Sequence, residues 1–177
     1  MPSDSSTTGF LSEAELKDSP GVPSAPRRRK GPVAAIECME DIPCNPCESS
    51  CNYDAITVGD DITNLPYLHE DNCVACQTCV YICPGQAIFM IDESLSDNRA
   101  IVMMPYEYRP LPQKEDIVTA LDRAGRELGD AKVVRVRQTK KMDQTATVTI
   151  EVPRDWSMQA RAIRLKSSKL KAESSRK

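Results

Sequence analysis

Apolar and polar residues alternate most regularly in the second half of the chain, and a period of two is typical of a half-buried strand. The predicted strands are 100–104, 117–121, 132–137 and 146–152. The second of these fits a helical face almost as well when it is read on to residue 128, but we favour a strand that turns at 124–125. Residues 140–143 indicate a turn before the last strand. The pattern predicts a small antiparallel β module.

Two shorter apolar runs, 55–58 and 87–91, each follow a stretch rich in cysteine. The cysteines before the first run recur 32 residues later before the second, with the same internal spacing. A repeat at a fixed offset indicates one structural unit used twice. Each copy predicts a cysteine loop, a helical turn, another cysteine and a strand.

Both ends of the chain are polar. Residues 1–31 are rich in Ser, Pro and charge, and we expect them to be a disordered tail because they cannot bury enough apolar surface. Residues 157–177 carry seven basic residues and one acidic residue, and are expected to be a basic tail with a helix over 160–170. Between the tails we expect two units, 32–95 and 96–156.

Charge changes this picture, because it is distributed unevenly. Residues 32–95, here called the cysteine segment, hold eleven acidic residues, all eight Cys and no Lys or Arg. A surface without positive charge argues against binding to nucleic acid.

No run reaches the length of a membrane span and no secretory signal is present, so we expect a cytoplasmic protein. Cysteines in that compartment indicate metal ligands rather than disulfides. The basic run 27–30 has two interpretations. It is either a solvated charge run or a clamp that holds the cysteine segment or a partner protein.

The second cysteine run has the spacing Cys73-x2-Cys76-x2-Cys79-x3-Cys83, followed by Pro84. This is the ligand spacing of bacterial-type [4Fe–4S] clusters. Three cysteines with two residues between each pair can wrap one cubane, and the fourth turns away to hold the other cluster of a two-cluster protein. Zinc is the alternative, because C-x2-C pairs also suit a tetrahedral ion. Four cysteines followed by proline favour iron and sulfide.

The first run, Cys38-x5-Cys44-x2-Cys47-x3-Cys51, has a longer first spacing, and Asn52 replaces the proline. Eight cysteines nevertheless make two complete sets of four. We therefore predict two [4Fe–4S] clusters with crossed ligands. Cluster I would be held by Cys38, Cys44, Cys47 and Cys83, and cluster II by Cys73, Cys76, Cys79 and Cys51. The loop 39–43 must bulge to keep Cys38 in reach of its cluster. The alternative is that Cys38 is a spare or labile ligand, which would give a three-iron cluster.

These motifs resemble a two-cluster bacterial ferredoxin over residues 36–91. The resemblance implies an α+β class with a βαββαβ fold, followed here by the β module. The segments 37–48, 105–107, 110–112, 122–125 and 145–152 also resemble a small iron–sulfur subunit of flavin-dependent amino-acid or amine dehydrogenases, of the hydroxyproline- and opine-oxidising type. That resemblance, over about residues 33–165, implies a flavoprotein partner and an electron acceptor.

No catalytic set emerges from the rest of the sequence. His69 is the only histidine and is expected to be a surface residue, and no glycine-rich phosphate loop is present. We expect a non-catalytic electron-transfer subunit of an oxidoreductase. The alternatives are a stand-alone ferredoxin with an appended module and an iron–sulfur protein whose clusters are structural or sensory.

Overall fold

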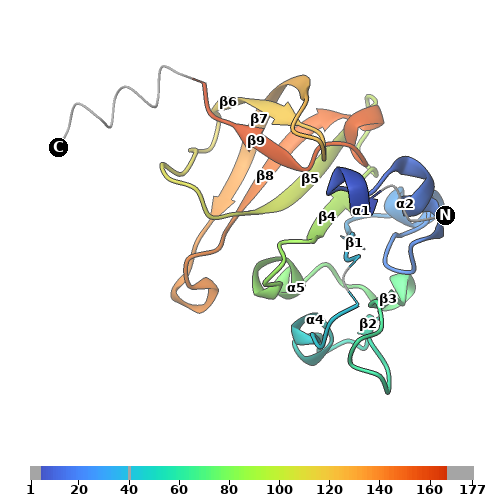
Figure 1. Ribbon diagram of the computed structural model, residues 1–177. Helices are drawn as coiled ribbons and strands as arrows, with labels where there is room; N and C mark the ends of the chain where they lie inside the picture. The colour runs from blue at the N-terminus through green and yellow to red at the C-terminus, as the bar shows by residue number, and fades with distance from the viewer. Residues whose placement is uncertain (1–4, 40, 167–177) are drawn as a thin grey trace.

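An antiparallel sheet of seven strands, in the order β1-β4-β5-β8-β7-β6-β9, runs through the molecule (Figure 1). The computed structural model describes residues 5–39 and 41–166. The strands of this sheet are β1 Val33–Ile36, β4 Ile88–Asp92, β5 Arg99–Tyr106, β6 Ile117–Leu121, β7 Glu127–Arg137, β8 Ala146–Pro153 and β9 Ala162–Arg164. In this part of the chain, no helix is both long and apolar enough to cross a membrane.

The cysteine segment follows the order β-α-β-β-α-β. Between β1 and β4 lie α4 Pro46–Ser49, β2 Ile56–Thr57, β3 Tyr67–Leu68 and α5 Thr78–Ile82, with the 3-10 helix η1 Glu70–Asn72 before α5. The strands β2 and β3 form a separate antiparallel pair. The two short helices contact each other, and α5 also contacts β4, β5 and β8 of the large sheet (Figure 1). The segment is thus a mixture of helices and strands, as its repeat predicts.

The four strands predicted for the second half are confirmed as β5, β6, β7 and β8. The ambiguous segment is a strand because β6 pairs along β7, with Ala120 opposite Gly129. That glycine has φ +144°, and a Cβ there would lie 2.6 Å from the ring of Trp156. The ring belongs to the 3-10 helix η3 Arg154–Trp156 and packs on the core of this half. A 3-10 helix, η2 Lys140–Met142, lies within the turn predicted before β8.

Strand β4 joins the cysteine segment to the β module. It pairs with β1 on one side and with β5 on the other, where Met90 is opposite Met103. Its side chains alternate between two cores, because successive residues of a strand point to opposite faces. Phe89 belongs to the core of the β module, whereas Ile88 and Met90 belong to the core beneath the cysteines. Burial on both faces explains why the run 87–91 is continuously apolar.

The prediction of a disordered tail over 1–31 is wrong for its larger part. Helix α2 Glu13–Asp18 begins with a capping box between Ser12 and Glu15, and its Leu16 is buried. Two further short helices are α1 Ser5–Thr8 and α3 Ala25–Arg28. Residues 12–31, here called the N-terminal arm, need no core of their own because they pack on the cysteine segment. Residues 1–4 lie outside the described residues.

Backbone hydrogen bonds tie this arm to the strands beside it. Leu68 N–H donates to the Pro20 carbonyl at 3.0 Å, and Ile36 N–H donates to the Gly21 carbonyl at 2.9 Å. A Cβ on Gly21 would lie 2.6 Å from the Cβ and the carbonyl oxygen of Ile36. The arm therefore approaches β1 closely enough to require glycine. Composition alone missed this, because it measures the apolar content of a segment and not the surface that the segment contacts.

The predicted helix over 160–170 is also wrong in its described part. Residues 162–164 form β9, which pairs with the edge of β6. Ala160, Arg161, Ile163 and Leu165 are each at most 8% exposed. Alternate burial of Ile163 and Leu165 suits a strand and not a helix. The predicted basic tail over 157–177 is therefore folded as far as residue 166, and residues 167–177 lie outside the described part.

Candidate metal centres

The eight cysteines line two separate cavities, four in each. The first cavity is lined by Cys38, Cys44, Cys47 and Cys83, and the second by Cys51, Cys73, Cys76 and Cys79. These are the two sets predicted for cluster I and cluster II. The structure therefore brings the members of each set together, including Cys38 despite the long loop that follows it. Residue 40 of that loop lies outside the described residues.

Two short helices give the arrangement its crossed form. Cys47 lies within α4 and Cys51 follows its end, while Cys79 lies within α5 and Cys83 is the residue at its C-terminal end. The two helices are in contact. Each helix supplies one thiol to each cavity, because the second cysteine lies beyond the helix end, where the chain changes direction. The proline after Asn45 begins α4, a position at which the missing N–H costs nothing.

The loop from Cys73 to Cys79 wraps the second cavity with left-handed backbone. Ala75 has φ +57° and Gln77 has φ +73°, conformations that side-chain-bearing residues adopt only rarely. Strain of this kind persists where the surrounding structure enforces it, often at functional sites. The loop thereby turns three cysteines toward one cavity within seven residues.

Gln77 also lines the second cavity, and its Oε1 is buried without a hydrogen-bond partner among the described residues. A buried polar atom without a partner calls for an explanation. The oxygen and nitrogen of an amide exchange places when its plane turns by half a revolution, which would bring the NH2 donors to the same point. A sulfide in the cavity would accept from them. The residue therefore fits a cavity that holds an iron–sulfur cluster.

No disulfide competes with a metal for these thiols. All eight cysteines are free, and Cys47 and Cys79 are buried. Burial, with the nearby Cys83 and Cys38, raises the pKa of the Cys47 thiol to about 11, and burial also raises the pKa of Cys79. Metal binding must therefore supply the positive charge that keeps these thiolates ionised.

The spacing of the ligands argues against a single ion. In the described part of the chain, no three His, Cys, Asp or Glu side chains converge closely enough to hold one metal ion. Four thiols around a cavity suit a cubane, in which each cysteine sulfur binds a different iron atom. The residues present therefore fit a [4Fe–4S] cluster better than tetrahedral zinc.

Positive charge reaches the cysteine segment from the β module. Glu37, the residue before Cys38, accepts hydrogen bonds from Arg123 at 2.5 and 2.7 Å and from Arg161 at 2.8 Å. The Arg161 guanidinium also lies 4.7 Å from the centre of the Phe89 ring. All three charged side chains are nearly inaccessible, being 7%, 12% and 4% exposed. This ion-paired network, here called the Glu37 network, couples the loop of the first cavity to β6 and β9.

Burial alone would raise the pKa of Glu37, but its hydrogen bonds and ion pairs with the two arginines outweigh burial and hold the pKa below the usual value. Burial lowers the pKa of Arg161 to about 10, so its guanidinium is still charged at neutral pH. The network therefore carries one negative and two positive charges.

The N-terminal arm brings a second group of cations. Arg28 forms an ion pair with Glu93 at 2.7 Å, and Arg27 hydrogen-bonds carbonyl oxygens of the cysteine segment. Of the two interpretations of the run 27–30, the clamp on the cysteine segment is therefore confirmed for these two arginines. Arg29 and Lys30 are exposed. Sequence reasoning missed the individual roles, because the four neighbouring cations look alike in the sequence.

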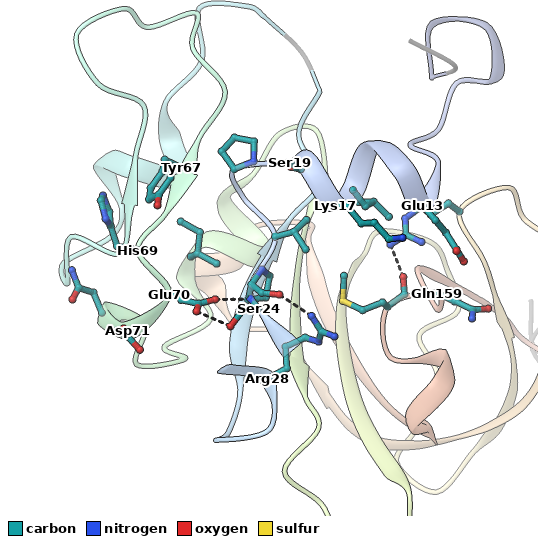
Figure 2. Close-up of a pocket in the computed structure, with 18 of the residues that line it drawn as sticks. Glu13, Lys17, Ser19, Ser24, Arg28, Tyr67, His69, Glu70, Asp71 and Gln159 are labelled. Carbon is teal, nitrogen blue, oxygen red and sulfur yellow. Dashed lines mark hydrogen bonds between the residues drawn. The ribbon is translucent and has the colours of Figure 1, made fainter. Parts of the chain in front are cut away.

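A larger cavity, of about 1030 Å³, lies where the arm passes β3, η1 and the residues around η3 (Figure 2). Figure 2 shows Ser24 hydrogen-bonded to the Glu70 carboxylate at one side of it. His69 is exposed at its rim, as predicted, and its Nε2 is 3.0 Å from the Thr57 hydroxyl. None of the eight cysteines lines this cavity, so it is separate from the two thiol sites.

Comparison with known families identifies a 4Fe–4S binding domain, Fer4, at residues 66–89. The matched stretch contains Cys73, Cys76, Cys79 and Cys83. No solved structure matches the chain. The chain therefore contains an iron–sulfur domain of ferredoxin type, and such a domain is generally an electron carrier rather than a catalyst. Its [4Fe–4S] cluster and its role in iron–sulfur electron transfer follow from this match.

Proposed function

We propose that this chain carries electrons through two [4Fe–4S] clusters, as a non-catalytic subunit that passes them from a flavin-dependent dehydrogenase to an acceptor. The observation that carries the proposal is the pair of thiol-lined cavities, each with four cysteines drawn from both copies of the repeat. When bound, each cluster supplies a one-electron carrier. The crossed ligand sets and the order β-α-β-β-α-β support a ferredoxin-type fold for the cysteine segment.

The protein's own contribution is to hold the clusters and to control access to them. Cys47 and Cys79 are buried beside apolar residues, which limits contact with water around the cluster core. Cys76 is exposed, and Val74 and Tyr53, which line the same cavity, are 55% and 48% exposed. This edge of cluster II offers a redox partner both a short approach and an apolar contact surface.

A subunit role is supported by the extent of structure beyond the cysteine segment. The strands β5 to β9 add a sheet that carries no cysteine, yet this sheet is continuous with β1 and β4. A carrier that diffuses freely does not need such an addition, whereas a subunit can use it for docking. Copurification of a flavoprotein with the tagged chain would support the subunit role, and isolation of a fully loaded chain without one would favour the stand-alone ferredoxin.

Metal analysis tests the two clusters directly. Protein purified without oxygen is expected to contain about eight iron and eight sulfide per chain, since two cubanes hold four of each. Zinc without sulfide, or about four iron, would refute the proposal. Cys83→Ser should damage cluster I and Cys51→Ser should damage cluster II, as seen in separate electron paramagnetic resonance signals. If each substitution affected the cluster of its own cysteine run, the crossed assignment would be wrong.

A further inference from the structure

Arg27 of the N-terminal arm reaches the loop that holds the second thiol cavity. Its Nη2 donates to the carbonyl of Cys73 and its Nε donates to the carbonyl of Glu70, both at 2.9 Å. Its Nη1 donates to the Gly31 carbonyl at 3.1 Å. The guanidinium thus joins the arm to the first cysteine of the second run. Ala34 N–H also donates to the sulfur of the same cysteine, at 3.5 Å.

The positive charge of Arg27 has no ion-pair partner in the part of the chain that the structure describes. Among the residues that the structure describes, Arg28 pairs with Glu93, and Arg123 and Arg161 pair with Glu37, but no carboxylate lies within ion-pair distance of Arg27. The nearby Glu70 carboxylate instead accepts from the backbone N–H and hydroxyl of Ser24, at 2.6 and 2.8 Å. A partly buried guanidinium that contacts only carbonyl oxygens leaves its charge available to another negative group.

We infer that Arg27 is a positioning residue for cluster II, which fixes the Cys73 loop and whose charge raises the reduction potential of that cluster. The inference rests on the proposed function. A cluster with four thiolate ligands is negative, and reduction adds one more negative charge. A fixed cation beside it therefore stabilises the reduced form more than the oxidised form. Because the cysteine segment has no Lys or Arg, this charge has to come from outside it.

The neighbouring Arg29 is a matched control. It follows α3 Ala25–Arg28 directly, is exposed, and has neither a side-chain hydrogen bond nor an ion pair within the described part of the chain. Arg29→Gln removes the same charge from the same arm without touching the cysteine loop. Arg27→Lys keeps the charge but loses the planar fork that binds several carbonyls at once.

The experiment is a redox titration of the full chain, with each cluster followed by electron paramagnetic resonance, in the wild type and in Arg27→Gln, Arg27→Lys and Arg29→Gln. At the wild-type midpoint potential, Arg27→Gln should lower the ratio of reduced to oxidised cluster II at least threefold, or about 28 mV at 59 mV per tenfold for one electron. Arg29→Gln should produce less than half of this shift, and Arg27→Lys should recover more than half. Cluster I should shift less than cluster II.

Four results would overturn the inference. Equal shifts in the two glutamine variants would mean that net charge acts without a specific site. Loss of iron from cluster II in both Arg27 variants would mean that the residue is only structural. An unchanged potential in Arg27→Gln, with two clusters present in the wild type, would reject this role and leave the proposed function intact. A wild-type protein with no cluster at these cysteines would overturn both proposals, so the two failures are distinguishable.

Discussion

Neutralising Glu37 should destabilise the protein far more than its small change in shape suggests. The substitution Glu37→Gln keeps the side-chain size but leaves Arg123 and Arg161 facing each other without a carboxylate. Their side chains are only 12% and 4% exposed, so water cannot compensate for the lost charge. Removing one partner of a buried ion pair costs about 3–5 kcal/mol in unfolding free energy. For a chain of this size, that loss lowers the melting temperature by about 6–20 °C.

The assay is thermal unfolding of the cluster-loaded protein at one fixed scan rate, since unfolding of cofactor proteins is rarely reversible. The control is Glu151→Gln, which breaks a pair with Arg99 in the same sheet. These side chains are 32% and 41% exposed, so the loss should be at most about 1 kcal/mol. The iron content of each variant should be measured first, because Glu37 precedes Cys38. A loss in Glu37→Gln no larger than in the control would refute the reasoning.

A double variant tests whether the cost comes from charge. Adding Arg161→Met to Glu37→Gln removes one of the two unpaired cations and keeps an apolar contact with Phe89. The double variant should therefore be more stable than the sum of the single effects by about 0.5–3 kcal/mol. Because the pKa of Glu37 is lowered, its contribution is present above the ordinary carboxyl range and is lost as the pH falls through the folded-state pKa. The difference between wild type and Glu37→Gln should thus be the same at about pH 6 and pH 8.

Three further predictions concern other parts of the chain. Asn52 has an N–H without a protein acceptor among the described residues. Asn52→Pro should lower the reduction potential of the cluster ligated by Cys51, because a hydrogen-bond donor to sulfur is lost. A redox titration that shows a rise in this potential would contradict the prediction. Gly129→Ala should lower the unfolding free energy, measured in thermal melts, by about 1–3 kcal/mol, because the new methyl group clashes with the Trp156 ring. An unchanged stability would mean that the ring moves aside. Deleting residues 167–177 should slow assembly with the proposed flavoprotein partner more at low salt than at high salt, without changing iron content. Equal rates in both salts would mean that these residues have no role in docking.

The cysteine chemistry of this protein is determined by its sequence. The spacing of Cys73, Cys76, Cys79 and Cys83 predicts a [4Fe–4S] ligand set, and the Fer4 match covers the same residues. The period of two likewise predicts β5 to β8. These features are local, since a ligand loop or a strand depends on residues close together in the chain. Local patterns are therefore sufficient to predict them.

The N-terminal arm, the strand β9 and the Glu37 network depend instead on contacts between distant residues. The arm is ordered because β1 and β3 offer it backbone partners, and residues 162–164 are a strand because β6 has a free edge. Arg27 and Arg29 are indistinguishable in the sequence, yet only Arg27 reaches the Cys73 carbonyl. Only the tertiary structure decides which charges lie beside which cavity, because the fold and not the chain order sets the distances between them.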